Sequence, residues 1–263
     1  MYVVHDVHSL GTGGSYYINV LNTTSNLWRA RFLGAGQFPA SLRFTAVQAF
    51  PSGEAIMFVG EVTGSSSRAD IYNISSNVWS QSPGGLSTPR MFTHQEYGSV
   101  GNFLIFAGGT TFSKAVDMYN TKTAVWNSTQ LSIGRETCTV ATIPSRGLFF
   151  CIGGRWKADW LNRGTRKVYI FDANSGLWRS QDGPPQLDTF IAQSAVSVGG
   201  RYVFVTGGNS HGQFSNAVLK YDVDSDSWQT LTTTLGQSRS FHSAVEISGL
   251  VFVLGGLITG ALP

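Results

Sequence analysis

The sequence predicts an all-β fold of five to six repeated units, each made of four antiparallel strands. Three observations lead to this prediction. An apolar run that ends in paired glycine occurs four times, a tryptophan recurs about every 50 residues, and no segment keeps a 3.6-residue apolar period. The repeated tryptophans are Trp28, Trp79, Trp126, Trp178 and Trp228. A repeat of this length without helical periodicity is typical of a small sheet that recurs along the chain.

The first two strands of each unit, A and B, are marked by an arginine and by the glycine pair. An arginine opens strand A at Arg43, Arg90, Arg135 and Arg239, with Thr189-Phe190 at the remaining position. Strand B is the apolar run before the pair, in Leu104–Gly109, Phe149–Gly154, Tyr202–Gly208 and Val251–Gly256, with a degenerate copy at Met57–Glu61 and a candidate copy at Tyr2–Asp6. We expect the paired glycines to allow positive φ or a close approach of two backbones.

The last two strands, C and D, are marked by an aromatic residue followed by Asn or Asp, and then by the tryptophan. The matching segments are Tyr72-Asn73 with Trp79, Tyr119-Asn120 with Trp126, Phe171-Asp172 with Trp178 and Tyr221-Asp222 with Trp228; Leu21-Asn22 with Trp28 fits less tightly. Asn, Asp, Ser and Gly fill the short segments between these strands, which predicts tight turns. The tryptophans are expected to be largely buried between neighbouring sheets.

Taken together, these landmarks resemble the kelch family across essentially the whole chain. Four kinds of landmark recur in a fixed order, and the spacing matches kelch repeats better than the shorter WD40 repeats. The resemblance implies a kelch-type β-propeller in which four-stranded blades surround a central channel. It also implies a single domain over residues 1–263, with repeats at roughly 1–30, 43–80, 90–127, 135–179, 190–229 and 239–263.

The number of blades stays open at this point, because the termini supply incomplete units. If the strand from Phe241 to Ile247 completes the N-terminal blade, there are five blades and one surplus strand. Otherwise there are six blades, two of them incomplete. A surplus strand at Leu250–Gly256 would leave an open sheet edge, which propellers avoid by closing the circle, so a chain cut from a longer protein is an equal alternative.

Composition excludes several classes of function. The net charge of +3 and a charged fraction of 13% argue against nucleic-acid binding, and no apolar run is long enough to span a membrane. The two cysteines, Cys138 and Cys151, lie in apolar strands and are expected to be free thiols, because a symmetric hairpin around Pro144–Gly147 sets Cys151 opposite Val140 and leaves Cys138 as its diagonal neighbour, too far away for a disulfide. The low charge and the sequons at Asn22, Asn73 and Asn127 favour an extracellular setting over a cytoplasmic one.

No group of residues predicts catalysis. Copper radical oxidases that resemble galactose oxidase share the scaffold, but their site needs two His, two Tyr and a Cys, and the five histidines here form no such cluster. His94 and His242 fall in A strands, where structural packing near the channel is the favoured interpretation. Phosphate-binding and dinucleotide-binding fingerprints are absent. We therefore assign no catalytic residue, no metal ligand and no cofactor.

The connection between strands B and C of the fourth repeat is the most unusual segment of the chain. Residues 155–167 carry five positive charges and one negative charge, a net +4 that exceeds the +3 of the whole protein. The candidate binding residues in it are Arg155, Trp156, Lys157, Trp160, Arg163 and Arg166. Trp and Arg are enriched at interface anchors, so this segment predicts binding of an acidic or aromatic partner. The alternative is a solvated basic loop whose tryptophans fold back onto the ring.

Two further candidates, Glu136 and Ser240, follow directly from the kelch resemblance. In kelch adaptors of ubiquitin ligases, the residue after the repeat arginine lines the binding mouth, and the matching positions here are Phe44, Met91, Glu136 and Ser240. We expect a non-catalytic module that presents its B–C and D–A loops to a protein or peptide partner. The alternative is a propeller enzyme or a lectin-like domain that acts on a carbohydrate or another small molecule.

Overall fold

The computed structural model describes residues 17–22, 27–32, 45–60, 66–156, 164–188, 191–210 and 213–258. Four antiparallel sheets of four strands each are complete, and the strand order in each sheet follows the chain. We number these sheets blades 2 to 5, because an incomplete blade precedes them in the chain. Blade 2 contains β3 (Ala46–Ala49), β4 (Ala55–Val59), β5 (Arg68–Asn73) and β6 (Val78–Gly85). Blade 3 contains β7 (Tyr97–Val100), β8 (Phe103–Ala107), β9 (Ala115–Asn120) and β10 (Val125–Gln130). Blade 4 contains β11 (Thr139–Ile143), β12 (Leu148–Ile152), β13 (Lys167–Asp172) and β14 (Leu177–Asp182).

Blade 5 contains β15 (Ser194–Val198), β16 (Tyr202–Thr206), β19 (Val218–Asp222) and β20 (Ser227–Thr230). Two half blades flank the four complete ones: β1 (Tyr17–Asn22) with β2 (Leu27–Phe32), and β22 (Ser243–Ile247) with β23 (Leu250–Leu254). Short pairs join β17 (Asn209–Ser210) to β18 (Gln213–Phe214) and β21 (Arg239–Ser240) to β24 (Leu257–Ile258). The helical elements in the described residues are three 3-10 turns, η1 (Thr110–Phe112), η2 (Pro144–Arg146) and η3 (Pro185–Asp188).

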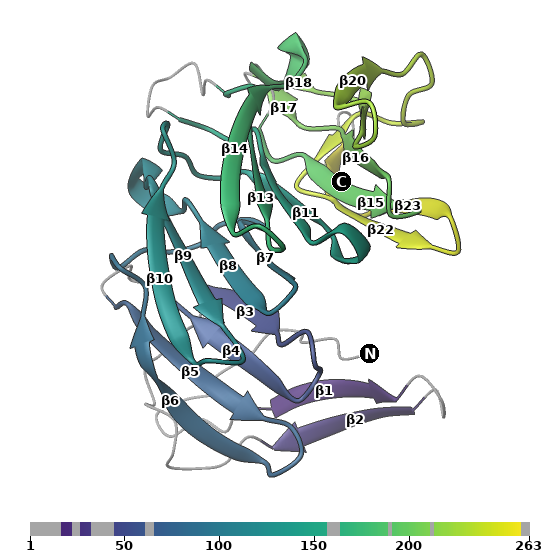
Figure 1. Ribbon diagram of the computed structural model, residues 1–263. Helices are drawn as coiled ribbons and strands as arrows, with labels where there is room; N and C mark the ends of the chain where they lie inside the picture. The colour runs from purple at the N-terminus through teal and green to yellow at the C-terminus, as the bar shows by residue number, and fades with distance from the viewer. Residues whose placement is uncertain are drawn as a thin grey trace.

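The blades lie side by side in chain order along an arc, with the two half blades at its ends (Figure 1). The predicted all-β propeller of four-stranded blades, incomplete at its termini, is therefore confirmed, and the ring formed by the described strands is open. The candidate strand at residues 2–6, together with Arg43, Phe44 and Thr189-Phe190, lies outside the described residues. The assignment of 1–263 as one domain stays a prediction.

The core lies between neighbouring blades. Side chains alternate between the two faces of a strand, so each B strand presents one set of residues to the blade before it and another to the blade after it. In β8, for example, Leu104 and Phe106 share a buried cluster with blade 2, whereas Ile105 and Ala107 share one with blade 4. Both faces of the central B strands are thereby buried, which explains why these strands read as continuous apolar runs.

The register of every C–D hairpin places the repeated Trp opposite the aromatic residue of strand C. The pairs are Trp79 with Tyr72, Trp126 with Tyr119, Trp178 with Phe171 and Trp228 with Tyr221, and Trp28 pairs with Leu21 in the same position. Trp126 reaches the preceding blade, where its indole N–H donates to Ser82 at 2.8 Å. The four tryptophans whose burial is described are mostly buried, and Trp126, Trp178 and Trp228 pack against the clusters between blades, as predicted; part of each ring stays exposed because strand D is the outermost strand of its blade.

The glycine pairs bring two backbones into contact, as predicted. Gly109 has φ of 108°, and a Cβ atom there would lie 2.6 Å from the carbonyl oxygen of Met91. Gly154 has φ of 92°, and a Cβ atom would lie 2.8 Å from the backbone nitrogen of Cys138. An L-residue would be strained at either position and would push strand A away from strand B.

The repeat arginines stabilise the close approach of strands A and B with buried hydrogen bonds. Arg90 is fully buried; its Nη1 forms an ion pair with Asp117 of β9 at 2.6 Å, and its Nε donates to the carbonyl of Gly108 at 2.6 Å. Arg135 donates from Nη1 to the carbonyls of Gly153 at 2.7 Å and Lys167 at 3.0 Å. Each arginine thus links its own strands A, B and C.

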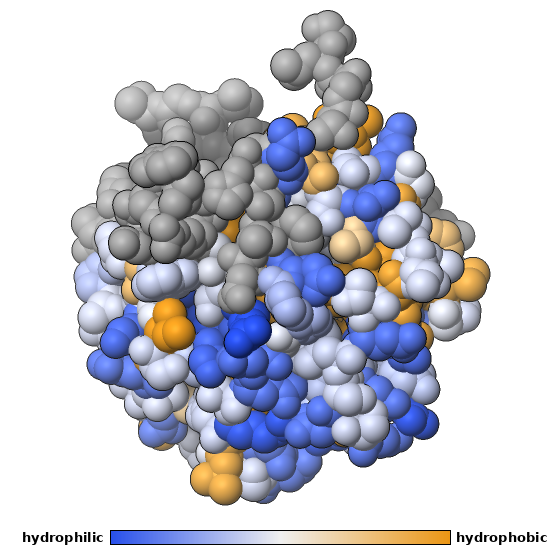
Figure 2. Space-filling model, turned by 90° about the horizontal axis from the view of Figure 1, so that it is seen from above, coloured by the Kyte–Doolittle hydropathy of each residue, from blue (hydrophilic) through white to orange (hydrophobic). Residues whose placement is uncertain are grey.

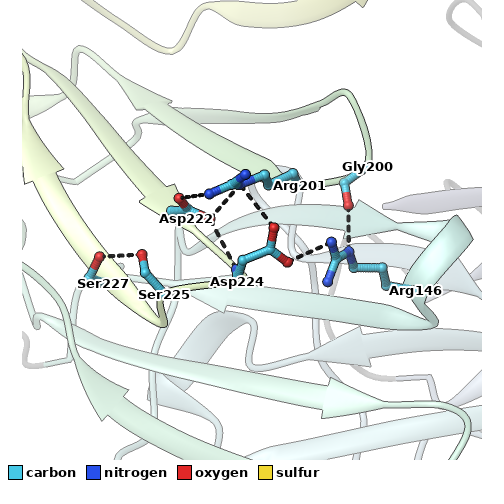
Figure 3. A network of polar contacts seen from close by, with 7 residues as sticks. All are labelled: Arg146, Gly200, Arg201, Asp222, Asp224, Ser225 and Ser227. Carbon is cyan, nitrogen blue, oxygen red and sulfur yellow. Dashed lines mark hydrogen bonds and ion pairs between the residues drawn. The ribbon is translucent and has the colours of Figure 1, made fainter.

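An exposed polar network joins blades 4 and 5 at their turns (Figure 3). Arg146 pairs with Asp224 at 2.6 Å and donates to the carbonyl of Gly200 at 2.8 Å. Arg201 makes two hydrogen bonds with Asp222, at 2.9 and 2.7 Å, and contacts Asp224 at 3.0 Å. The hydrogen bonds from Arg201 lower the pKa of Asp222 to about 2. Such solvent-exposed pairs stabilise the blade contact only modestly.

Cys138 and Cys151 are buried free thiols, as predicted. Cys151 lies opposite Val140, also as predicted, so that Cys138 is its diagonal neighbour. The expectation that this placement keeps the thiols apart was wrong, because the two sulfurs are 2.9 Å from each other. Both side chains belong to the cluster between blades 3 and 4, so they project from the same face of the twisted sheet.

Replacing Arg90 with Met should lower the free energy of unfolding by about 3–5 kcal/mol, because it leaves the carboxylate of Asp117 buried and unpaired. Arg146→Met, which removes an exposed pair, is the matched control and should cost about 1 kcal/mol or less. Urea unfolding followed by tryptophan fluorescence measures both changes. Equal losses in the two variants would contradict the role given to the repeat arginine.

Candidate functional site

The two ends of the blades carry different connections. Figure 3 shows an A–B turn and a C–D turn of neighbouring blades meeting on one face, at Arg146 and Asp224. The B–C and D–A connections meet on the opposite face, where the backbone of Ser113 in a B–C connection accepts a hydrogen bond from Arg135 at the start of the next blade. Because strands A to D form a simple meander, this division holds for every blade.

A cavity of about 360 Å³ opens on the face of the B–C and D–A connections, between blades 3 and 4. Its lining comes from the B–C connection of blade 3, the D–A connection that follows, and the B–C connection of blade 4: Phe112, Lys114, Ser132, Ile133, Gly134 and Trp156. The lining is mostly apolar, and Lys114 is the basic residue among the described residues that line it. Trp156 has 40% of its surface exposed.

Backbone hydrogen bonds hold the walls of this cavity in place. Leu131 donates to the carbonyl of Lys114 at 2.8 Å, and Arg135 donates to that of Ser113 at 3.0 Å. Gly134 has no room for a side chain, since a Cβ atom there would lie 2.0 Å from the carbonyl oxygen of Phe112. The cavity is therefore formed before any ligand arrives.

Arg155 and Glu136 position Trp156. Their backbones exchange two hydrogen bonds, at 2.9 and 2.7 Å, and their side chains form an ion pair. The guanidinium of Arg155 also lies over the ring of Phe112, 5.4 Å from its centroid. Arg155 thus connects the B–C loops of blades 3 and 4, and Glu136 is buried beneath it.

The candidate residues from the sequence divide into three groups. Trp156 lines the cavity, and Arg155, which precedes it, forms an ion pair with Glu136. Arg166 lies away from its lining, with its Nε 3.5 Å from Asp182, and Ser240 is fully buried in β21. Lys157, Trp160 and Arg163 lie outside the described residues. Ser240 therefore presents no accessible surface to a ligand.

The charge of the 155–167 segment is partly neutralised by its surroundings. Glu136 pairs with Arg155, and Asp182 contacts both Arg166 and Lys167, the latter at 2.7 Å. The net +4 overstates the field that a ligand would meet, because the paired acids lie elsewhere in the sequence. The cavity residues Phe112, Lys114 and Ile133 were missed for a similar reason: their position just after Gly109 or before Arg135 is the only signal in the sequence.

A second polar group lies just before the A strands β7 and β22. His94 and His242 were predicted to fall in A strands, but both lie in the segments that precede them. Glu96 is buried and accepts hydrogen bonds from the backbone N–H groups of Thr93, at 2.8 Å, and of Thr137; burial nevertheless raises its pKa to about 8. Burial lowers the pKa of His94, and burial with the nearby Arg239 lowers that of His242 to about 4. Burial disfavours the charged form of all three groups, and the packing role of the two histidines stays a prediction.

Within the described ranges, no group of three or more His, Cys, Asp or Glu side chains could hold a metal ion. In the same part of the chain, no helix is long and apolar enough to cross a membrane.

Acid should destabilise the fold partly through His242. Its pKa in the folded state, about 4, lies below the usual 6.5, so its contribution to stability is complete above pH 6.5 and is lost as the pH falls towards 4. His242→Gln, which keeps a polar partner for Thr206, should therefore show a smaller drop in unfolding free energy between pH 7 and pH 4.5 than the unsubstituted protein. Parallel urea titrations at the two pH values measure this; identical drops in the two proteins would disprove it.

Comparison with known proteins agrees with this architecture. The family model described as the KLHDC2/KLHL20/DRC7 Kelch-repeats domain matches residues 17–256. The search of curated proteins found no significant match. Kelch-repeat domains are generally protein-interaction modules. The matched residues include all four complete blades and both half blades, so the chain belongs to the kelch-repeat family.

Proposed function

We propose that this protein is a non-catalytic binding module that holds a protein or peptide at the cavity between blades 3 and 4. The observation that carries the proposal is the preformed, mostly apolar cavity with a partly exposed Trp156 at its wall. A rigid aromatic anchor beside a formed pocket is the arrangement found at the energetic centre of many protein interfaces. Because backbone hydrogen bonds already order the walls, binding loses little entropy there.

The chemistry of the lining indicates the ligand. Phe112, Ile133 and Trp156 favour an apolar or aromatic side chain, and Lys114 favours a carboxylate next to it. Arg155 is committed to Glu136 and Phe112, so its role is to position Trp156. The ligand we propose is therefore a peptide segment with an aromatic or aliphatic residue beside an acidic one.

We also propose an extracellular setting, which the sequons support. Asn127 is exposed on the outermost strand of blade 3, and Asn73 lies in the C–D turn of blade 2, where its Oδ1 accepts a hydrogen bond from Ser76 at 2.9 Å. Intact-mass analysis after secretion from a glycosylating host tests this. Glycans at these sites would support the setting, and their complete absence would count against it.

Trp156→Ala should weaken the binding of peptides selected against the protein by about 2 kcal/mol, roughly 30-fold, since exposed aromatic anchors carry much of an interface's energy. Leu177→Ala is the matched control. Leu177 is 69% exposed but lies at a C–D turn on the opposite face, so its loss should leave affinity unchanged. Titration calorimetry with peptides from a random library measures both. Equal affinity for the protein and its Trp156→Ala variant, with preserved folding, would disprove the site.

Charge reversal tests the acidic half of the ligand. Lys114→Glu should weaken binding of acidic peptides and reduce its dependence on salt, because exposed charges are screened over roughly 8–10 Å at physiological ionic strength. Lys122→Glu makes the same change in the same blade, at the C–D turn of the opposite face. Affinity measured at two salt concentrations should respond to the first variant only. If glycans bind and peptides do not, the lectin-like alternative holds instead.

A further inference from the structure

The chain contains two cysteines, and the fold brings them together at one point of blade 4. Cys138 directly precedes β11, and Cys151 lies in β12. Their sulfur atoms are 2.9 Å apart, and both side chains are fully buried. The two residues are 13 positions apart in the sequence, so the contact between them depends on the β11–β12 hairpin.

Blade 4 alone has cysteine at these two positions. In the register of strands A and B, Cys138 corresponds to a polar residue in the other blades, and Cys151 corresponds to an apolar one. The polar residues are Thr45, Gln95, Gln193 and His242, and the apolar residues are Phe58, Phe106, Val205 and Val253. Thr45, for example, accepts a hydrogen bond from the backbone of Phe92 in the next blade. In blade 4 the residues at these two positions contact each other instead.

Arg135 favours a negative charge on Cys151. Its Nη1 lies 3.9 Å from the sulfur of Cys151. Burial by itself raises the pKa of Cys151, but the hydrogen bond with Cys138 and the charge of Arg135 outweigh burial and lower this pKa. The hydrogen bond with Cys151, together with burial, raises the pKa of Cys138. A thiolate next to a thiol is the arrangement from which disulfides form.

The surroundings of the pair leave the two sulfurs as each other's nearest reaction partners. Both cysteines belong to the apolar cluster between blades 3 and 4. The carbonyl oxygen of Ala107 lies 3.9 Å from the sulfur of Cys138, which is the same distance as that between Arg135 and Cys151. Seen from above, hydrophilic residues predominate in the lower half of the molecule, in keeping with apolar strands that pack between blades (Figure 2).

We propose that Cys138 and Cys151 form a reversible redox couple, in which a disulfide joins the start of β11 to β12 under oxidising conditions. The oxidant is a small peroxide such as hydrogen peroxide, which reaches the buried pair through local opening of the blade contact. The couple is independent of the proposed ligand site, since neither cysteine lines the described cavity.

The oxidation proceeds in two steps. The sulfur of Cys151 attacks one oxygen of the peroxide, the O–O bond breaks, and the leaving hydroxide takes up a proton to form water, which leaves Cys151 as a sulfenic acid. The sulfur of Cys138 then attacks the sulfur of Cys151; the S–S bond forms, the S–O bond breaks, and the hydroxyl group leaves with the thiol proton of Cys138 as a second water. Two thiols and one peroxide thus give one disulfide and two waters.

The disulfide would add a covalent link at a point where two backbones already meet. Gly154 lies so close to Cys138 that a Cβ atom there would be 2.8 Å from the Cys138 nitrogen. A cross-link at this point restricts the unfolded chain more than the folded one. The oxidised protein should therefore melt at a higher temperature than the reduced protein, and amides of β11 and β12 should exchange with solvent more slowly.

Mass spectrometry of the unsubstituted protein tests whether the bond forms. The reduced protein is treated with hydrogen peroxide, then with catalase, and finally with N-ethylmaleimide in denaturant. It should be lighter by two hydrogen atoms and carry no maleimide, whereas untreated protein should carry maleimide on both cysteines. Dithiothreitol should reverse the change. Cys138→Ser is the matched control, and its monomer should lose no hydrogen.

Equilibration in glutathione buffers tests whether the fold positions the two sulfurs. The relevant ratio is the squared concentration of reduced glutathione divided by the concentration of oxidised glutathione. Because the folded chain holds the sulfurs together, half-reduction of the folded protein should need a ratio at least about tenfold higher than half-reduction of the urea-unfolded protein.

Three results would overturn the proposal. If both cysteines of the peroxide-treated protein still react with maleimide after denaturation, the pair does not close. Disulfides found only between chains would lead to the same conclusion. Equal glutathione ratios for the folded and unfolded protein would show that the fold gives the pair no advantage.

Discussion

The structure depends on one constraint: each central strand must be covered on both faces by a neighbouring blade. Strand B is apolar throughout, so it cannot face water on either side without losing hydrophobic stabilisation. The buried clusters accordingly lie between blades rather than within them. A blade is therefore not an independent folding unit, and the sequence must repeat the same few residues to supply each interface.

The same residues leave one face of the molecule available for function. The glycine pairs and repeat arginines secure the crossing of strands A, B and C near the axis, and the turns at Arg146 and Asp224 tie the opposite ends. Most residues of the B–C and D–A connections take no part in the strand crossing or in the contacts at the opposite ends. These connections can therefore vary in length and composition. The cavity between Phe112 and Trp156 arises where three such connections meet.

Local signals predicted the fold well, because each landmark has a local cause. Paired glycine indicates that two backbones cross closely, and the repeated Trp indicates the register of the C–D hairpin. Both features lie where the sequence predicts them. The candidate site was predicted only in part. Arg155, Trp156 and Glu136 do meet, but Lys114 and Ile133 belong to the cavity through contacts between repeats that no local pattern encodes. The same limit applies to Asp182, which neutralises charges that the sequence alone counted as free.

The open arc described here implies a gradient of local stability along the chain. Blades 3 and 4 have a complete neighbour on each side, whereas β22 and β23 belong to a half blade that packs against β15 of blade 5. In repeat architectures, stability is close to a sum of unit and nearest-neighbour terms, so opening begins at the units with fewest neighbours. Backbone amides of β12 and β16 should thus exchange with solvent through rare cooperative events, whereas those of β23 exchange through frequent local ones. Local unfolding of the molecule should therefore begin at the two ends of the arc. Any contact that covers these ends should also slow the unfolding of the blades between them.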